Sequence, residues 1–435
     1  MRISVIGCGY LGAVHAASMA DLGHEVVGID VDEAKIAELS AGRAPFFEPG
    51  LPEVLTSATA SGRLRFTTDL AAAEGADVHF VAVGTPQSAD GDAADLRFVD
   101  AAFTALLDHV KPGDVLVGKS TVPVGTATRL AALVAERAPE VTLTWNPEFL
   151  REGFAVQDTV SPDRLVYGVP SGPAGERAAG LLDEVYAKAV AAGTPVIVTD
   201  YATAELVKVA ANAFLATKIS FINAMAEIAE VTGADVTQLA DAIGHDARIG
   251  RRFLNAGVGF GGGCLPKDIR AFTARARELG RGEAVEFLAE VDKINLRRRD
   301  RVVELVREEA GELAGLRVAV LGLAFKPHSD DVRDSPALDV AVRLADAGAI
   351  VIASDPEAIP NSRRRAPQLG YAETAEEAAA GADIVVLITE WPEFRGLDPV
   401  ALGEIVGEKR VIDGRNVLDP AFWRAAGWSY RGLGR

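Results

Sequence analysis

Short apolar runs alternate with amphipathic stretches along the first third of the chain. Residues 3–6 form the first apolar run, and a glycine-rich turn leads into a helical pattern that extends to about Leu22, where Gly23 suits a helix end. A second apolar run covers residues 25–29 and stops at Asp30. Short runs of this kind are typical of buried parallel strands. The alternation therefore predicts a doubly wound parallel sheet. Further strands are expected at residues 78–83, 115–118 and 141–145, with a helix at about 95–109.

A continuous helical pattern runs from Ala202 to about Val231. Its apolar residues recur at helical spacing: Leu206, Val209, Phe214, Ile219, Ile222 and Ile228. Roughly 30 residues at 1.5 Å each give a helix of about 45 Å, which is longer than one small domain. We therefore expect this helix to span between domains and to form a homodimer interface. Helical segments continue to about Ala310.

The strand and helix rhythm restarts near residue 317. Apolar runs at residues 317–321 and 350–353 repeat the first two strands, and Asp355 takes the place of Asp30. Residues 381–386 also echo residues 75–80. We predict an α/β fold with two Rossmann-like doubly wound domains joined by the long helix. The expected parts are residues 1–200, a helical region over 201–310 and residues 311–435, with a ligand cleft between the α/β domains.

Composition narrows the range of partners. A chain of 435 residues is too long for one core, and its net charge of −18 argues against nucleic acid and anionic membranes as partners. Two widely spaced cysteines do not form a disulfide framework, which fits a reducing cytoplasmic location. The first strand begins at Ile3 and leaves no room for a signal peptide, and no uninterrupted apolar stretch is long enough to span a membrane.

The first glycine-rich turn fits the pattern G-x-G-x-x-G at Gly7, Gly9 and Gly12. The pattern allows a tight turn, a close approach of a diphosphate to the backbone, and close packing of helix on strand. Asp30 would accept hydrogen bonds from the adenosine ribose, and a second carboxylate at Asp32 would repel a 2′-phosphate. The motif therefore predicts NAD rather than NADP as cofactor. Cys8, inside the motif, is expected to be structural.

Cys264 lies in a second glycine-rich run, Gly259-Phe260-Gly261-Gly262-Gly263-Cys264-Leu265-Pro266-Lys267-Asp268. Pro266 suits the first position of a helix, so the thiol would lie near a helix N-terminus with Lys267 close by, and both features lower a thiol pKa. Asp268 is four residues on, within reach as a base. A thiolate can attack an aldehyde, and a second oxidation then gives a thioester that water releases as an acid. The alternative is a buried structural cysteine.

Two further segments supply complementary polar groups. Residues 146–152 follow an expected strand at the edge where α/β proteins bind ligands, and they contain Glu148 and Glu152. Lys208 and Asn212 are one helical turn apart and share a face of the long helix. Their N–H groups could stabilise an oxyanion, although such pairs are often only a solvated face.

Five segments occur together in one order: residues 7–12, Ser120-Thr121-Val122-Pro123, Asn146-Pro147-Glu148-Phe149-Leu150, Lys208 with Asn212, and residues 259–268. This arrangement resembles the UDP-glucose/GDP-mannose dehydrogenase family over nearly the whole chain. The resemblance implies a two-step oxidation of a sugar C6 alcohol to a carboxylate with two NAD consumed, and UDP-glucose as the default substrate. It also implies an NAD-binding and a sugar-nucleotide-binding domain on either side of a dimerising helix, with no metal.

The resemblance assigns roles to individual residues. Cys264 is the nucleophile and Asp268 the assisting carboxylate, and the other catalytic residues are Lys208, Asn212, Glu148, Glu152 and Thr121. The implied cofactor contacts are Gly7, Gly9, Tyr10, Leu11, Gly12, Asp30, Lys35, Thr85, Thr121, Glu152, Lys267 and Arg333. The implied substrate contacts are Glu148, Phe149, Leu150, Lys208, Asn212, Arg248, Phe253, Leu254, Phe260, Gly261, Phe325, Lys326 and Arg415. Arg248 is expected to reach the substrate of the partner subunit.

Basic residues and the glycine pattern of the C-terminal half indicate how the phosphates of the sugar nucleotide would be bound. We expect a basic pocket in this acidic protein from Arg248, Arg251, Arg252, Lys267, Lys326 and Arg415, although Arg251 and Arg252 could equally form a solvated surface. The C-terminal half has Phe325 and Pro327 where a dinucleotide motif has its later glycines. That half is expected to bind the sugar nucleotide rather than a second NAD.

Three alternatives remain open. The first is a sibling enzyme acting on TDP-glucose, GDP-mannose or a UDP-N-acetylhexosamine, although residues 259–268 favour the glucose branch over the hexosamine branch. The second is a two-electron hydroxyacid dehydrogenase, which would need no Cys264. The third is a non-catalytic NAD-binding redox sensor.

Overall fold

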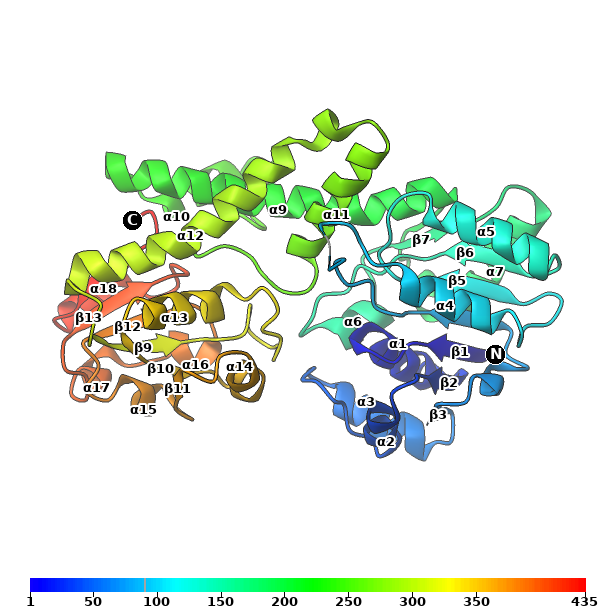
Figure 1. Cartoon of the computed structure of the whole chain (residues 1–435), viewed down its shortest axis with the longest axis horizontal. Coiled ribbons are helices and arrows are strands. Elements are labelled where there is room, and N and C mark those ends of the chain that lie inside the picture. The colour runs from blue at the N-terminus through cyan, green and yellow to red at the C-terminus, as the bar shows by residue number, and fades with distance from the viewer. Residues whose placement is uncertain (90) are drawn as a thin grey trace. The chain divides into compact units, whose positions relative to one another are not determined.

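The computed structural model describes residues 1–89 and 91–435, and the chain forms two compact units. The first unit comprises Met1–Ala211 and Ala274–Gly280, and the second comprises Asn212–Thr273 and Arg281–Arg435. Figure 1 labels most of the elements of both units along the chain. The predicted α/β class with two Rossmann-like domains and a long central helix is confirmed. The three-part boundaries at residues 200 and 310 stay a prediction.

The first unit is built on an eight-stranded sheet in the order β3-β2-β1-β4-β5-β6-β7-β8. Its strands are β1 (Arg2–Ile6), β2 (Glu25–Ile29), β3 (Leu64–Thr67), β4 (Val78–Val81), β5 (Val115–Gly118), β6 (Thr142–Trp145), β7 (Leu165–Gly168) and β8 (Val196–Thr199). Its helices are α1 (Tyr10–Asp21), α2 (Glu33–Ser40), α3 (Leu51–Ala60), the 3₁₀ turn η1 (Leu70–Ala73), α4 (Arg97–Leu106), α5 (Thr126–Arg137), α6 (Ala155–Val160), α7 (Pro173–Val185) and α8 (Ala187–Ala191).

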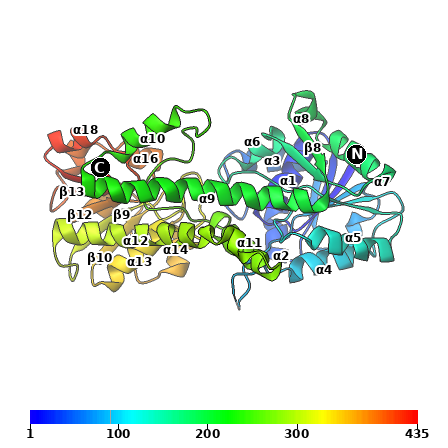
Figure 2. The same cartoon turned by 90° about the horizontal axis from the view of Figure 1, so that it is seen from above.

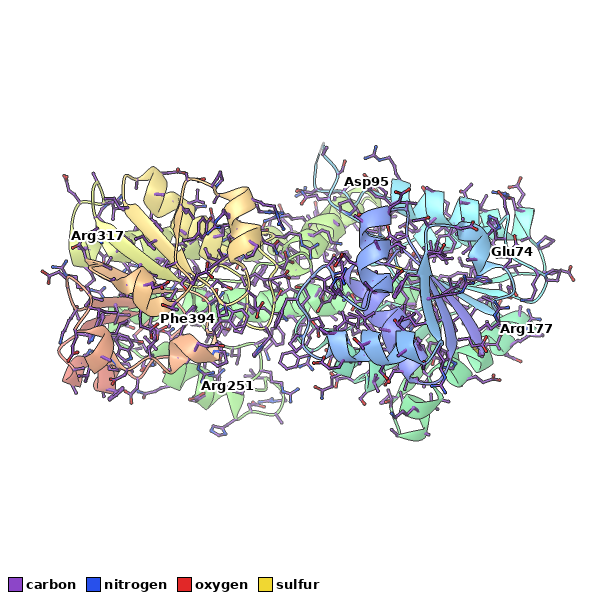
Figure 3. All side chains as sticks on the ribbon, turned by 90° about the horizontal axis from the view of Figure 1, so that it is seen from below. Glu74, Asp95, Arg177, Arg251, Arg317 and Phe394 are labelled. Carbon is purple, nitrogen blue, oxygen red and sulfur yellow. The ribbon has the colours of Figure 1, made fainter. Side chains whose placement is uncertain are left out.

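Side chains of β1 alternate between two hydrophobic cores, one on each face of this sheet. Ile3 and Val5 pack in one core, while Ile6 packs in the other. In β1 the residues after Arg2 are all buried, which explains why the strand appears in the sequence as an unbroken apolar run. Charged side chains such as Glu74 and Arg177 are exposed on this unit (Figure 3).

The sheet departs from the fully parallel arrangement expected. Strands β1 to β6 are parallel, but β7 pairs antiparallel with β6 through Trp145 and Gly168. A parallel neighbour requires a long crossover, usually a full helix. Only the six-residue α6 lies between β6 and β7, so the chain turns back at the edge where β6 ends.

The second unit repeats the first six strands of that order in an all-parallel sheet, β11-β10-β9-β12-β13-β14. Its strands are β9 (Arg317–Leu321), β10 (Ile350–Ser354), β11 (Gly370–Tyr371), β12 (Ile384–Leu387), β13 (Arg410–Asp413) and β14 (Ser429–Gly432). Its other helices are α10 (Val236–Gly244), η2 (Gly282–Val285), α12 (Phe287–Ala310), α13 (Pro336–Asp346), α14 (Ile359–Arg365), α15 (Ala375–Ala379), α16 (Pro392–Arg395), α17 (Pro399–Leu402) and α18 (Pro420–Ala425), while α11 (Leu265–Glu278) has residues in both units. The predicted repetition of the first half is therefore real, since β12 occupies the position of β4 in the same order.

The long helix α9 spans Tyr201–Thr232, as predicted within one residue at each end, and is the long green helix of Figure 2. Residues up to Ala211 belong to the first unit and the remainder to the second. Among the described residues it is the one helix long and apolar enough to cross a membrane, with a hydropathy of 1.3 in its most apolar window. This is weak evidence for a membrane span, because a core helix of a soluble protein passes the same test and 44% of that window is buried.

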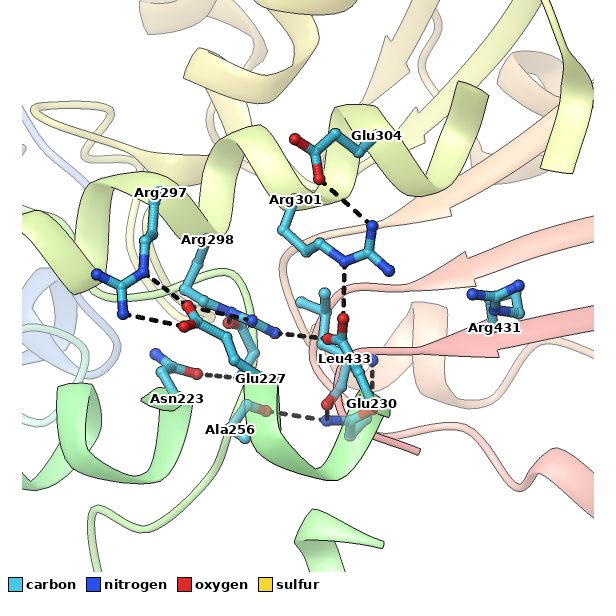
Figure 4. Close-up of polar contacts among 12 residues, drawn as sticks. Asn223, Glu227, Glu230, Ala256, Arg297, Arg298, Arg301, Glu304, Arg431 and Leu433 are labelled. Carbon is cyan, nitrogen blue, oxygen red and sulfur yellow. Dashed lines mark hydrogen bonds and ion pairs between the residues drawn. The ribbon is translucent and has the colours of Figure 1, made fainter. Parts of the chain in front are cut away.

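Ion pairs tie the second half of α9 to α12 (Figure 4). Arg297 pairs with Glu227 at 2.8 Å, and Arg301 pairs with Glu230 at 2.7 Å. Between them the fully buried Arg298 reaches Glu230 at 3.3 Å. A buried guanidinium is tolerated only when carboxylates surround it. These pairs therefore fix the register of α9 against α12 within the second unit.

Candidate active site

The first glycine turn has the geometry of an anion site. A Cβ at Gly12 would lie 1.8 Å from Gly7 O, so only glycine lets α1 start this close to β1. A Cβ at Gly9 would meet nothing within 4 Å, so open space lies over that backbone. No side chain caps α1 and no acidic residue stands in its first turn. The free N–H groups and helix dipole at this end suit a diphosphate, so the residues present fit a dinucleotide.

Asp30 lies at the end of β2 beside this turn. Its Oδ2 accepts hydrogen bonds from Cys8 N at 2.8 Å and from Lys35 Nζ at 2.9 Å. Asp32 instead caps α2 through Lys35 N at 3.0 Å. Burial, followed by the charge of Asp30, raises the pKa of the Cys8 thiol to about 12. Cys8 therefore remains a protonated, buried thiol with a packing role.

The equivalent carboxylate of the second unit, Asp355, is differently engaged. It is buried, and Leu323 N and Ala324 N donate to its Oδ2 at 2.7 and 2.9 Å, as Cys8 N does to Asp30. Trp391 Nε1 adds a third donor to Oδ2 at 3.1 Å, while Ala358 N donates to Oδ1 at 2.8 Å. A carboxylate with its lone pairs occupied in this way has no capacity left for ribose hydroxyls.

Cys264 is an exposed thiol immediately before α11. Its carbonyl oxygen accepts the Asp268 N–H at 2.9 Å, the first hydrogen bond of the helix, which makes Cys264 the N-cap. The helix begins at Leu265, one residue earlier than Pro266 was expected to start it. The thiol is therefore held in the position where the helix dipole favours a thiolate.

The glycines before Cys264 have close neighbours in the second unit, and at Gly261 the neighbour is backbone that cannot give way. A Cβ at Gly261 would lie 2.2 Å from Asp334 O, and one at Gly263 would lie 2.5 Å from the guanidinium of Arg333. Asn295 on α12 also holds the loop, since its Oδ1 accepts Phe260 N at 2.7 Å and its Nδ2 donates to Phe260 O at 3.0 Å. The loop is a packed support for the thiol rather than a slack linker.

Asp268 lies one turn into α11 and is buried. Asn212 Nδ2 donates to its Oδ2 at 2.7 Å, and Lys267 Nζ lies 2.9 Å from its Oδ1. Both partners were expected at the site from the sequence. The second unit thus joins the buried Asn212 and Asp268 with the partly buried Lys267 in one polar group, of which Lys267 and Asp268 follow Cys264 in α11.

A second carboxylate, Glu148, forms an ion pair with Lys208 in the first unit. Lys208 Nζ on α9 is 2.9 Å from Glu148 Oε1, and both side chains are mostly buried. Lys208 Nζ also lies 5.7 Å from the ring centre of Phe149, and the Glu148 Oε2 accepts Leu150 N at 2.8 Å. Lys208 and Asn212, one turn apart on α9, therefore each hold a carboxylate from a different segment.

Comparison with known proteins identifies this arrangement. Residues 1–190 match the NAD binding domain, residues 202–297 the central domain, and residues 319–420 the UDP binding domain of the UDP-glucose/GDP-mannose dehydrogenase family. The chain belongs to this family. The resemblance predicted from the motifs is confirmed, and the chain is an NAD-dependent oxidoreductase of nucleotide-sugar metabolism.

Sequence identity to individual relatives differs between branches of the family. A UDP-glucose 6-dehydrogenase of Rhizobium meliloti (strain 1021) is 44% identical over 100% of both chains. A solved UDP-glucose dehydrogenase from Pyrobaculum islandicum is 41% identical with a TM-score of 0.90, covering 100% of this chain and 97% of that one. A UDP-D-ManNAc dehydrogenase from Pyrococcus horikoshii is 27% identical with a TM-score of 0.86, covering 100% and 99%.

Several of the cations expected at the substrate phosphates or, for Arg333, at the cofactor have acidic partners. Arg248 is exposed and pairs with Asp246 at 2.6 Å, Arg251 pairs with Asp241 at 2.5 Å, and Arg333 pairs with Asp331 at 2.7 Å. Arg415 donates to Ile388 O at 2.6 Å and to Gly259 O at 2.8 Å, so it braces the cysteine loop. The Lys326 ammonium lies 5.5 Å from the ring centre of Phe325. Leu254 and Phe260 are buried, whereas Phe253 is 40% exposed and has a left-handed φ of 65°.

Sequence reasoning missed the buried groups that hold the site loops. Glu48 accepts Gly153 N and Ala155 N, both at 2.6 Å, and also the hydroxyl of Tyr10, so it ties the segment after Glu152 to the glycine turn. Glu205 accepts Gly125 N and Ala127 N, both at 2.7 Å, and fixes the loop that follows Thr121. Thr85 Oγ1 donates to Thr121 O at 2.9 Å.

Proposed function

We propose that this protein oxidises UDP-glucose at C6 to UDP-glucuronate in two NAD-dependent steps, through a thiohemiacetal and a thioester on Cys264. The observation that carries this proposal is the position of Cys264, an exposed thiol at the N-cap of α11, the helix in which the buried Asp268 is held by Asn212 and Lys267. A dehydrogenase that stopped at the two-electron stage would have no use for such a thiol.

The bonds change in a balanced sequence. NAD, when bound, supplies the hydride acceptor for both oxidations, and Gly7, Gly9, Gly12 and Asp30 would hold it. In the first step the C6 alcohol loses its hydroxyl proton and a hydride and becomes an aldehyde. The Cys264 sulfur then bonds to C6 and the oxygen takes up a proton, which gives the thiohemiacetal. Loss of a second hydride and that proton gives the thioester; water then breaks the C–S bond and frees the carboxylate, the thiolate and two protons.

Protein side chains stabilise charge at each stage of this sequence. Lys208 and Asn212 present N–H donors on one face of α9, and these suit the oxyanions formed at C6 during thiol attack and hydrolysis. Asp268 and Glu148 keep the two donors oriented through the hydrogen bonds described above. Glu152 acts on the sugar and in the hydrolytic half of the reaction, and Thr121 orients the catalytic water or the cofactor.

The substrate assignment within the family rests on the degree of likeness. Identity to the UDP-glucose enzymes is 44% and 41%, against 27% for the UDP-D-ManNAc enzyme. A substrate panel with UDP-glucose, TDP-glucose, GDP-mannose and UDP-N-acetylhexosamines tests it. We expect UDP-glucose to give the highest kcat/KM, with about two NADH formed per sugar consumed. One NADH per sugar, or NADH from another nucleotide sugar only, would contradict the proposal.

The exposed face of α9 supports assembly as a homodimer. Phe214, Phe221 and Ile228 follow one another at seven-residue intervals, which places them on one stripe of the helix, and all three are exposed. Three large apolar side chains in a row on a water-facing helix indicate a protein contact. A second copy of α9 offers the same stripe and would cover it by two-fold symmetry.

A single substitution in this stripe tests the dimer. Phe221→Glu places a charge at its centre and is expected to convert a dimer into a monomer, halving the mass measured by light scattering after gel filtration. Leu279→Glu changes an equally exposed apolar residue outside the stripe and should leave the mass unchanged. A wild-type protein that is already monomeric would refute the interface.

The net charge of −18 and the two free cysteines fit a cytoplasmic enzyme that binds neither nucleic acid nor membrane.

We also propose that the enzyme has three functional regions: residues 1–200 bind NAD, residues 201–310 carry the dimer interface and Cys264, and residues 311–435 bind the sugar nucleotide.

A further inference from the structure

One buried cation of the first unit has no role in the reaction described so far. Lys119 directly follows β5, and its side chain is enclosed, with only 6% of the residue exposed. In the described part of the chain the hydrogen-bond partners found for its ammonium group are uncharged: Asn146 Oδ1 at 3.0 Å, Tyr186 Oη at 3.2 Å and Asn146 O at 3.5 Å. The ring centres of Phe80 and Tyr186 both lie 5.7 Å from the nitrogen.

Folding alone does not explain a lysine at this place. Burying an ammonium group with neutral partners costs several kcal/mol, and apolar side chains of similar volume are often neutral or stabilising at such sites. A methionine could pack against the same two aromatic rings. The charge of Lys119 therefore serves a purpose other than the stability of the fold.

The neighbours of Lys119 connect it to the reacting groups. Asn146 is fully engaged: its N–H donates to Gly118 O at 2.8 Å, its Nδ2 donates to Val166 O at 3.0 Å, and its Oδ1 also accepts the Tyr186 hydroxyl at 2.7 Å. Glu148 comes two residues after this anchored asparagine and holds Lys208. Lys119 thus fixes the turn that presents the Glu148 carboxylate.

The charge of Lys119 also acts on that pair. Burial lowers the pKa of Lys119 to about 8, while the Glu148 carboxylate works in the opposite direction and the Lys208 ammonium in the same direction as burial. The remaining titratable neighbours are neutral near pH 7, because burial lowers the pKa of His15 on α1 and raises that of Tyr186 at the end of α7. The field on Glu148 and Lys208 therefore changes when Lys119 itself loses its proton.

We propose that Lys119 is a positioning residue for the oxidation: its ammonium group holds Asn146, and through Asn146 the turn that presents the Glu148 carboxylate to Lys208. The proposal rests on the proposed function, in which Glu148 and Lys208 act on the sugar. The charged ammonium group donates to Asn146 Oδ1 and Asn146 O, and a charged donor makes a stronger hydrogen bond than a neutral amine. Deprotonation of Lys119 above about pH 8 should therefore loosen this turn in the wild-type enzyme.

The test compares Lys119→Met and Lys119→Arg in the full-length enzyme by kcat–pH profiles with UDP-glucose and NAD. Lys119→Met should lower kcat about tenfold at pH 7.5, show no further fall above about pH 8, and leave the Tm unchanged or higher. Lys119→Arg keeps its charge at high pH and should lose the fall in kcat that the wild type shows above about pH 8. Lys111→Met, at the opposite end of β5, should retain the wild-type profile.

The possible results separate the proposals. A Lys119→Met profile that superimposes on the wild type, or a fall in kcat that only follows a fall in Tm, overturns the role of Lys119. If Lys119→Met does not fold, an alkaline limb shared by Lys119→Arg and the wild type overturns it. Lys208→Met is measured in parallel: wild-type activity there refutes the proposed site and this inference together, whereas lost activity with an unchanged Lys119→Met profile refutes the inference alone.

Discussion

Cys264→Ala is expected to lower UDP-glucuronate formation by about 10⁴-fold or more, the scale seen when a covalent nucleophile is removed. The substituted side chain is exposed at the N-cap of α11, and its loop is held by Asn295 and Arg415 rather than by the thiol. Binding of NAD and of UDP-glucose should therefore persist, as calorimetric titration with each ligand would show. The amount of UDP-glucuronate formed during overnight incubation, determined by mass spectrometry, measures the loss of activity.

Cys8→Ala is the matched control, because it removes the other cysteine of the chain. Cys8 is buried and its pKa is raised to about 12, so its removal should change stability at most. Intact mass of the quenched wild type under turnover should show a sugar-nucleotide adduct that is absent from Cys264→Ala. Normal uronate output from Cys264→Ala, or no adduct in the wild type, would contradict the covalent route.

The fold was largely predictable because its strands are short, buried and continuous in the sequence. Strands β2 and β5 lie at the predicted residues, and α9 differs from its predicted limits by one residue. The reversal of β7 could not be predicted in the same way. Its residues are as apolar as those of a parallel strand, and its direction depends on the path taken by the connection after Trp145.

The candidate site was predictable where glycines and reactive groups stand together in the sequence. The supporting residues were not, since each acts across a long separation: Asn295 on Phe260 over 35 positions, Glu205 on Gly125 over 80, and Glu48 on Gly153 over 105. A lone carboxylate or amide inside a helix or loop carries no sign of which distant N–H it accepts. Asp355 shows the converse, since it has the sequence position of Asp30 but its bonds are already occupied.

Asp268→Asn is expected to lower kcat about 10³-fold while the KM values for NAD and UDP-glucose change by less than about threefold. Asparagine has the same shape, so its Oδ1 can still accept Asn212 Nδ2, and the geometry of the pair survives. What is lost is the negative charge that faces Lys267 and, beside Cys264, the capacity to take up a proton. Steady-state NADH formation at saturating substrates measures the change.

Asp292→Asn supplies the control, because it breaks a different ion pair of α11. Asp292 is a partly buried carboxylate that pairs with Arg270 of α11 at 2.9 Å, as Asp268 pairs with Lys267. Removing that charge tests whether any broken ion pair on α11 slows the enzyme. If both variants lost activity equally, Asp268 would be acting through the stability of α11. If only Asp268→Asn lost activity, with an unchanged Tm, the Asp268 carboxylate would act in the reaction itself. The two substitutions each remove one carboxylate that pairs with a cation of α11, and only Asp268 pairs with Lys267, near Cys264 in the sequence.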